Sequence, residues 1–186
     1  MLIIGCGNRD RGDDGAGIVV AERLRELGLN AETCRGEALE LIEAWNGADD
    51  VVIVDAVVTS GPAGKVWLWD SGQLTMPETL SLSTHGFGVA EGIQLARALD
   101  CLPKHLRVFG IEGLRFELRS AISTKVMCAV KEVVAQITAE EVCHSGQGGG
   151  NSVKEKARPS DSHRTAVRHQ VRGRLIARLG EVIRSN

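Results

Sequence analysis

Short apolar runs that alternate with segments of helical periodicity constrain the fold of this chain more than any other feature. The clearest run is Val51–Val54, which is wholly apolar and β-branched, and such a run suits a strand that is covered on both faces. Leu2–Cys6 has the length and flanking residues of a buried strand, and Leu106–Ile111 is another predicted strand. Ala16–Leu27 carries apolar residues at helical spacing and is followed by Gly28, a typical C-terminal cap.

The remaining elements continue this alternation. We expect further strands at Ala31–Arg35 and Val66–Trp69, and further helices at Ala38–Trp45, Val89–Leu99 and Ser123–Ile137. Ser123 is the expected N-cap of the last helix. Asp70–Thr84 is a long polar loop, a type that is often functional in a compact domain. The order of strands and helices predicts an α/β protein built as a three-layer α/β/α sandwich.

Charge is distributed unevenly along the chain. Residues 151–186 contain two Lys and seven Arg against three acidic residues, a net charge of +6, so the first 150 residues carry −8 of the total of −2. An acidic body argues against a nucleic-acid surface on the folded domain.

No apolar run approaches the roughly 18–20 residues that span a bilayer, and the start Met-Leu-Ile-Ile-Gly lacks the basic residues of a signal peptide. We therefore expect a cytoplasmic protein with neither a nucleic-acid nor a membrane partner.

The composition changes near the end of the chain. We expect one domain at residues 1–142, followed by a Gly/Ser linker and a basic tail at residues 143–186. The tail is either one amphipathic helix or a solvated, partly disordered segment, and binding of an acidic partner by it stays open. Five scattered cysteines without a C-x-x-C spacing are expected to be small buried hydrophobic residues in a reducing compartment, not a zinc or disulfide framework.

The loop after the first strand, Gly5–Gly17, is rich in both glycine and aspartate. A dinucleotide fingerprint requires glycine at the sixth position, where this chain has Asp10. Phosphates seek the positive N-terminus of a helix, and three aspartates would repel them by about 1 kcal/mol or more each at close range. The loop therefore favours a cation. Asp13 is well placed as the N-cap of the following helix, which leaves Asp14 free for another role.

Two further residues can join Asp14 at the same edge of the sheet. Asp55 is expected to end the Val51–Val54 strand, and ligands of open α/β sheets bind outside the carboxyl ends of the strands. His85 precedes a helix and is followed by Gly86 and a second glycine, which allow close backbone approach. Two carboxylates and an imidazole suit a borderline divalent ion such as zinc or nickel. The alternatives are that Asp55 bonds its own backbone in a turn and that His85 is a cap or an ordinary surface residue.

These residues fall into four blocks that resemble the hydrogenase maturation endopeptidases, which process the large subunit of nickel–iron hydrogenases. The pattern G-x-G-N-x4-D-[DE]-G is matched by Gly5, Gly7, Asn8, Asp13, Asp14 and Gly15. The second block is the apolar strand that ends in Asp55, and the third is Ser83–Gly88, which contains His85. The fourth is Val108–Gly113. Together the blocks cover about residues 1–140 in the order of that family.

The resemblance implies a fold and a reaction. The fold is a twisted, largely parallel five-stranded sheet between helices, of the phosphorylase/hydrolase-like type. The reaction is one endoproteolytic cut, of an aspartic type, that removes the C-terminal extension of the large-subunit precursor after nickel insertion. The resemblance assigns metal binding to Asp14, Asp55 and His85, which are also the candidate catalytic residues although none is assigned as the base. It gives supporting roles to Gly5, Gly7, Asn8, Asp13, Gly15 and Gly86.

We expect the nickel to be brought by the substrate, without a permanently bound metal, and the enzyme to be a monomer. The sequence departs from the family at 116–124, where a Gly-x-x-Leu-Ser-Pro approach to the last helix is missing, and the basic tail has no counterpart. Peptidyl-tRNA hydrolases share a G-x-G-N start but need an early histidine and a basic groove. A nickel-binding checkpoint protein without proteolytic activity remains the main alternative, because no Ser/His/Asp or Cys/His nucleophile arrangement is visible.

Overall fold

A computed structural model describes residues 1–70, 88–146 and 173 of the chain. The chain divides into two compact units, Met1–Ala139 and Glu140–Asn186. The first unit contains the whole sheet and all but the last turns of the final helix. The helices are η1 (Gly12–Gly15, a 3₁₀ turn), α1 (Ala16–Glu26), α2 (Ala38–Trp45), α3 (Val89–Ala98) and α4 (Thr124–Gly146). The strands are β1 (Leu2–Cys6), β2 (Ala31–Cys34), β3 (Asp50–Val57), β4 (Val66–Asp70) and β5 (His105–Glu112).

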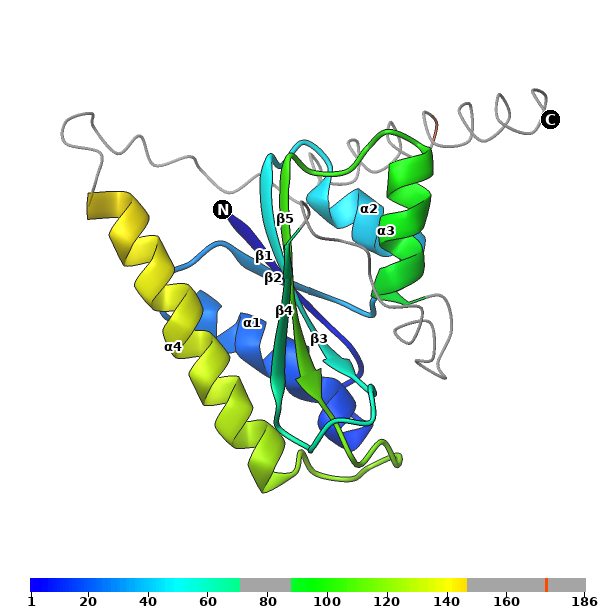
Figure 1. The fold of residues 1–186 in the computed structure, drawn as a ribbon, viewed down its shortest axis with the longest axis vertical. Coiled ribbons are helices and arrows are strands. Elements are labelled where there is room, and N and C mark those ends of the chain that lie inside the picture. The colour runs from blue at the N-terminus through cyan, green and yellow to red at the C-terminus, as the bar shows by residue number, and fades with distance from the viewer. Residues whose placement is uncertain (71–87, 147–172, 174–186) are drawn as a thin grey trace. The chain divides into compact units, whose positions relative to one another are not determined.

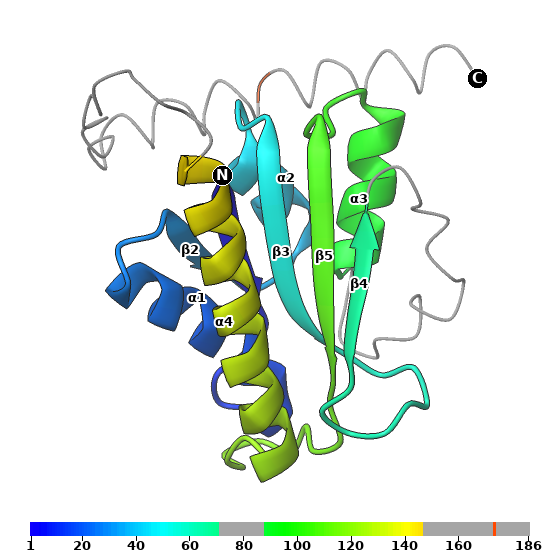
Figure 2. The ribbon, with the colours of Figure 1, turned by 60° about the vertical axis from the view of Figure 1, so that its left-hand side comes forward.

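The five strands form one sheet in the order β2-β1-β3-β5-β4. All neighbouring strands are parallel except β4, which is an antiparallel edge strand next to β5. Helices α1 and α4 cover one face of the sheet, and α2 and α3 lie on the other (Figures 1 and 2). The predicted three-layer sandwich with a largely parallel five-stranded sheet is therefore confirmed.

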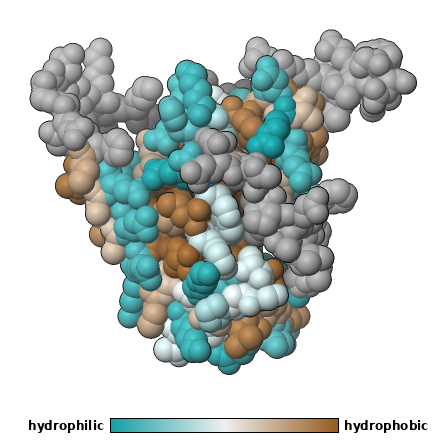
Figure 3. Space-filling view, viewed as in Figure 1, coloured by the Kyte–Doolittle hydropathy of each residue, from teal (hydrophilic) through white to brown (hydrophobic). Residues whose placement is uncertain are grey.

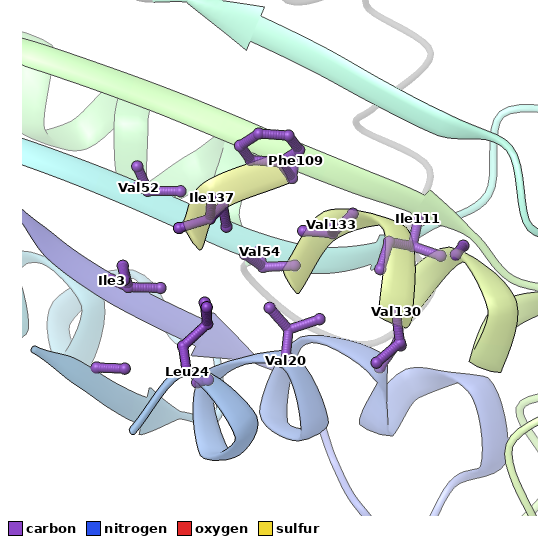
Figure 4. Packing of buried hydrophobic residues seen from close by; sticks show 14 of the residues in the cluster. Ile3, Val20, Leu24, Val52, Val54, Phe109, Ile111, Val130, Val133 and Ile137 are labelled. Atoms are coloured by element: carbon purple, nitrogen blue, oxygen red, sulfur yellow. The ribbon is translucent and has the colours of Figure 1, made fainter. Parts of the chain in front are cut away.

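The main core lies between the sheet and the pair α1 and α4. Figure 4 shows the side chains that fill it, which come from β1, β3 and β5 on one side and from the two helices on the other; the labelled residues are Ile3, Val20, Leu24, Val52, Val54, Phe109, Ile111, Val130, Val133 and Ile137. Burial of each such side chain stabilises the fold by about 1.5–3 kcal/mol. Because successive residues of a strand face opposite sides, this core also fixes which strand residues face α2 and α3.

Four expectations about the elements need correction or fall outside the described residues. β3 does not end at Asp55 but continues to Val57, because Ala56 and Val57 are also apolar and pair with Ile111 and Glu112 of β5. α4 does not end at Ile137 but reaches Gly146, because the sequence after Ile137 contains no glycine or proline before that point. The loop expected at Asp70–Thr84 lies outside the described residues after Asp70, as does the basic tail apart from Gly173.

Other predicted bounds agree with the structure to within one or two residues. α2 spans Ala38–Trp45 as expected, and Gly28 follows the C-cap of α1 with a φ of 88°, the conformation for which glycine is favoured at this position. Within the described part of the chain, no helix has the length and apolar character needed to cross a membrane.

Candidate functional site

The candidate site lies on the face of the sheet toward α2 and α3, near the carboxyl ends of the parallel strands. Strand register places Cys34 of β2 beside Cys6 of β1. It also places Asp55 of β3 beside Gly110 of β5, and Gly110 beside Trp67 of β4. Gly5 pairs with Val54, so the next residues of those strands, Cys6 and Asp55, are also neighbours. One row therefore runs across all five strands, with Asp55 at its centre.

The glycine-rich loop is shaped by close backbone packing. A Cβ at Gly17 would lie 2.2 Å from the Val54 carbonyl oxygen, and one at Gly5 would lie 2.1 Å from the Gly17 oxygen. Gly7 has a φ of 123°, and its Cβ would lie 1.9 Å from the Asp14 oxygen. These glycines bring the start of α1 directly onto β1 and β3, which holds Asp14 at the end of the sheet where Asp55 lies.

Asp14 and Asp55 interact electrostatically. Burial and then the negative charge of Asp14 raise the pKa of Asp55 to about 7, against a smaller opposing effect of the Ala56 N–H. That N–H donates to Asp55 Oδ1 at 2.9 Å. Asp55 lies within β3 and bonds the next residue of the strand, so it is not the turn aspartate considered as an alternative from the sequence. Both side chains are partly exposed. A carboxylate whose pKa is raised by the negative charge of a neighbouring carboxylate marks a site that favours a cation.

The third predicted ligand, His85, lies outside the described residues, as does Gly86. Among the residues that the structure describes, no group of three or more His, Cys, Asp or Glu side chains is arranged to hold a metal ion. The structure thus brings together two of the three predicted ligands, and the metal-binding role of all three stays a prediction.

The sequence predicted that Asp13 is the N-cap of α1, and this prediction is wrong. The N-cap is Gly15 without a side-chain cap bond, because the 3₁₀ turn η1 comes before the helix. The fully buried Asp13 carboxylate instead accepts hydrogen bonds from Leu114 N (2.9 Å), Arg115 N (3.0 Å), Ser123 N (2.6 Å) and Ser123 Oγ (3.1 Å). Burial alone raises the pKa of Asp13, but these donors outweigh it and the pKa is lowered. Asp13 therefore fastens the site loop to the segment that leads into α4.

Asn8 and Ser123 support the same loop. Asn8 Oδ1 accepts a hydrogen bond from Asp10 N at 2.9 Å, and Asn8 O accepts one from Arg11 N at 3.1 Å. Ser123 directly precedes α4, where it was expected, but its hydroxyl donates to Asp13. Within the 116–124 segment, which lacks the Gly and Pro of the family pattern, Arg119 N donates a further hydrogen bond to Asp10 O.

Glu112 is a further buried acid, and no role for it was predicted from the sequence. It ends β5, and its carboxylate accepts hydrogen bonds from Thr59 N (2.6 Å), Thr59 Oγ1 (2.6 Å), Gly61 N (3.2 Å) and Trp67 Nε1 (3.0 Å). Burial raises the pKa of Glu112, but these donors together lower it below its ordinary value. The signal available in the sequence was a lone acid at the end of an apolar strand, the same pattern that marked Asp55.

Comparison with known proteins gives the site a family. Residues 36–140 match the model of the hydrogenase maturation protease family. The chain belongs to this family. The match contains Asp55 and His85 and begins after the loop that carries Asp14.

Two curated proteins and one solved structure illustrate what this chain is similar to. The hydrogenase expression/formation protein HupD of Thiocapsa roseopersicina is 26% identical over 144 residues, 70% of this chain and 64% of HupD. Protein FrxA of Pyrococcus furiosus is 30% identical over 89 residues, 48% of this chain and 65% of FrxA. The chain thus spans just under two thirds of these relatives' length. The solved [NiFe] hydrogenase maturation protease HybD from Thermococcus kodakarensis is 28% identical, with a TM-score of 0.62 over 76% of this chain and 97% of that one.

Cys6, next to the site, is unsuited to act as a nucleophile in this member of the maturation protease family. Cys6 and Cys34 are buried, as expected, and their sulfur atoms lie 3.3 Å apart without a disulfide. The hydrogen bond to Cys34, burial, and the negative charges of Cys34, Asp55 and Glu40 raise the pKa of Cys6 well above its ordinary value, and the neutral thiol is a poor nucleophile. Cys128 and Cys143 are exposed and Cys101 is partly exposed, so the expectation that all five cysteines are buried is wrong for these three.

Proposed function

We propose that this chain is an endopeptidase that removes a C-terminal extension from the large-subunit precursor of a nickel–iron hydrogenase, after nickel has been inserted. The match of residues 36–140 to the maturation protease family carries the proposal. The interacting carboxylates of Asp14 and Asp55, at the carboxyl edge of the sheet, supply a chemical reason for it. The proposal includes a cytoplasmic enzyme that acts as a monomer, since it must reach the tail of another protein.

The nickel in this proposal belongs to the substrate. Asp14 and Asp55 offer oxygen ligands and His85 a nitrogen ligand, a set that suits a borderline divalent ion and leaves positions for the ligands of the precursor. A cation between Asp14 and Asp55 would remove the repulsion that raises the pKa of Asp55. Bound in this way, the nickel would dock the precursor and polarise the scissile carbonyl, while one of the carboxylates serves as the base for the attacking water.

The purified protein is expected to hold no stoichiometric metal after treatment with a chelator. It is expected to cleave a nickel-loaded precursor and to leave a nickel-free precursor intact, because only the loaded form carries the recognition element. Metal analysis of the protein, combined with intact-mass measurement of both precursors after incubation, checks this. Retention of chelation-resistant metal together with cleavage of the nickel-free precursor would contradict it.

Removal of the gene for this chain is expected to leave the host's hydrogenase large subunit with its C-terminal extension. Intact-mass spectrometry of that subunit measures the outcome directly. Wild-type protein should restore trimming and His85→Ala should not. His105→Ala is the matched control, because His105 is an exposed histidine at the opposite end of β5 from the site and its loss should leave trimming intact.

A subunit of normal mass in the deletion strain would contradict the proposal. It would favour the alternative of a nickel-binding checkpoint protein, which handles the metal without cutting the chain. Rescue by His85→Ala to the level of wild type would contradict the assignment of His85 while leaving the endopeptidase proposal standing.

A further inference from the structure

Two tryptophans of the edge strand lie beside the candidate site on the same face of the sheet. Trp67 pairs with Gly110 of β5, and Gly110 pairs with Asp55 of β3, so the three residues form one row. Leu68 pairs with Phe109, which belongs to the core under α1 and α4. Trp67 and Trp69, which flank Leu68, therefore face the opposite side together with Asp55. Both indoles are partly exposed.

The indoles are held in place by other described residues. Their ring centroids are 6.2 Å apart and their planes differ by 12°, which is a stacked arrangement. Trp67 Nε1 donates to the buried Glu112 carboxylate at 3.0 Å. The Trp67 ring also has a cation over it, since Lys65 Nζ lies 3.4 Å from the ring centroid. A large aromatic surface is thus fixed before any ligand binds, which lowers the entropy cost of binding.

Gly110 is the residue of β5 that lies between Asp55 and Trp67 in this row. A Cβ at this position would lie 2.6 Å from Cζ3 and 2.8 Å from Cη2 of Trp69, and 3.0 Å from Cγ1 of Val57. Glycine here allows the Trp69 ring to lie close over β5. The Trp69 indole thus reaches from β4 over β5 and lies, with Val57 of β3, in the space above Gly110.

We propose that Trp67 and Trp69 form a subsite for an apolar side chain of the precursor's C-terminal segment. This inference rests on the proposed endopeptidase function. Strands β3 and β4 are separated by two strand spacings, about 10 Å, and an extended peptide covers that distance in about three residues. The side chain on the indoles is therefore about three residues away from the position held at Asp55. Figure 3 shows hydrophobic surface near the middle of the view, next to paler residues of intermediate hydropathy.

The position of Lys65 sets the selectivity of this subsite. Its ammonium group already occupies one face of Trp67, so a lysine or arginine of the precursor would be repelled there while an aliphatic or aromatic side chain would not. Replacement by lysine of the precursor residue that contacts the indoles is therefore expected to weaken binding. A lysine scan of the three residues on each side of the cleavage point identifies that residue.

The first test is steady-state cleavage of the nickel-loaded precursor by purified full-length variants. Trp69→Ala is expected to raise KM about tenfold or more, as for an aromatic contact at the centre of an interface, with kcat changed by less than about threefold. Gly110→Ala should act in the same direction because it displaces the Trp69 ring. Leu68→Ala is the matched control: it lies between the two tryptophans, is 49% exposed and faces the other side of the sheet.

The second test reads binding without cleavage. The chain has three tryptophans, and the third, Trp45, is 2% exposed with an Nε1 that finds no hydrogen-bond partner among the described residues. Trp45→Phe therefore removes no polar contact and leaves an emission that comes from Trp67 and Trp69 alone. A synthetic peptide with the sequence of the precursor's C-terminal segment should change this emission in a saturable way, and its lysine-substituted form should do so only at much higher concentration.

The outcomes separate the subsite from the endopeptidase function. Normal KM values for Trp69→Ala and Gly110→Ala, with an active wild type and folded variants by thermal unfolding, would overturn the subsite alone. An inactive wild type would overturn the proposed function, and saturable quenching by the peptide would then still support the subsite. Equal effects of Leu68→Ala and Trp69→Ala on KM would also overturn the subsite, because a general loss of edge-strand packing would explain both effects.

Discussion

Asp55→Asn is expected to abolish precursor cleavage and at the same time to raise the thermal stability of the protein at pH 8. The loss of cleavage follows from the proposed roles of Asp55 as nickel ligand and candidate base, and the expected reduction in kcat/KM is about 100-fold or more. The gain in stability follows from the position of the carboxylate, which is partly buried and faces the charge of Asp14. Functional groups of this kind commonly reduce the stability of the fold that holds them.

The stability effect depends on pH in a defined direction. The pKa of Asp55 is about 7 in the folded protein and about 3.9 in an unfolded chain. Between these values the unfolded state has lost the proton while the folded state retains it, so wild-type stability falls as pH rises from about 4 to about 7. The full shift corresponds to about 4 kcal/mol, and partial exposure of the side chain reduces this to roughly 2–4 kcal/mol.

Thermal unfolding of wild type and Asp55→Asn across pH 4–8 measures this difference. The variant should melt at a higher temperature than wild type at pH 8, and the gap should close toward pH 4. Asp50→Asn is the matched control, because Asp50 lies at the opposite end of the same strand, and its effect should not follow that pH profile. A variant that is less stable than wild type at pH 8, or that cleaves the precursor at the wild-type rate, would contradict the prediction.

The fold was predictable because its signals are local. The run Val51–Val54 predicts a buried strand whatever its neighbours are, and the helical spacing of the α1 residues predicts a helix against it. The parallel order then brings the loop after β1 and the end of β3 to one edge, which is why Asp14 and Asp55 could be placed together before the structure was known. The ends of β3 and α4 were less predictable, because no turn or stop residue marks them.

The contacts that a sequence cannot show are those between residues far apart along the chain. Asp13 had the position of a helix cap, and nothing within ten residues of it distinguishes a cap from a tertiary contact. Its partners are 101 to 110 residues away. Glu112 and Trp67 are 45 residues apart, and the row from Cys34 to Trp67 exists only through strand register. Buried carboxylates with several donors are therefore the part of the site that required the structure.

Asp13→Asn is expected to destabilise the fold at neutral pH by about 3 kcal/mol or more, because hydrogen bonds to a buried charged group each contribute about 1.5–3 kcal/mol. The carboxylate accepts bonds from three backbone N–H groups and one hydroxyl, whereas an amide offers one oxygen and turns N–H groups toward the same donors. The melting temperature should fall by roughly 6–12 °C. Since the contact also holds the loop of Asp14, precursor cleavage should decrease as well.

The pH dependence of this effect is opposite to that of Asp55. The pKa of Asp13 is lowered in the folded protein, so its stabilising contribution is present above the unfolded value of about 3.9 and is lost as pH falls through the folded value. The gap in melting temperature between wild type and Asp13→Asn should therefore be widest near neutrality and should narrow in acid. Asp10→Asn, three residues earlier in the same loop and exposed, should change stability by no more than about 0.5 kcal/mol. Equal melting temperatures for Asp13→Asn and Asp10→Asn would show that the loop is held by its backbone packing at Gly7 and Gly17 instead.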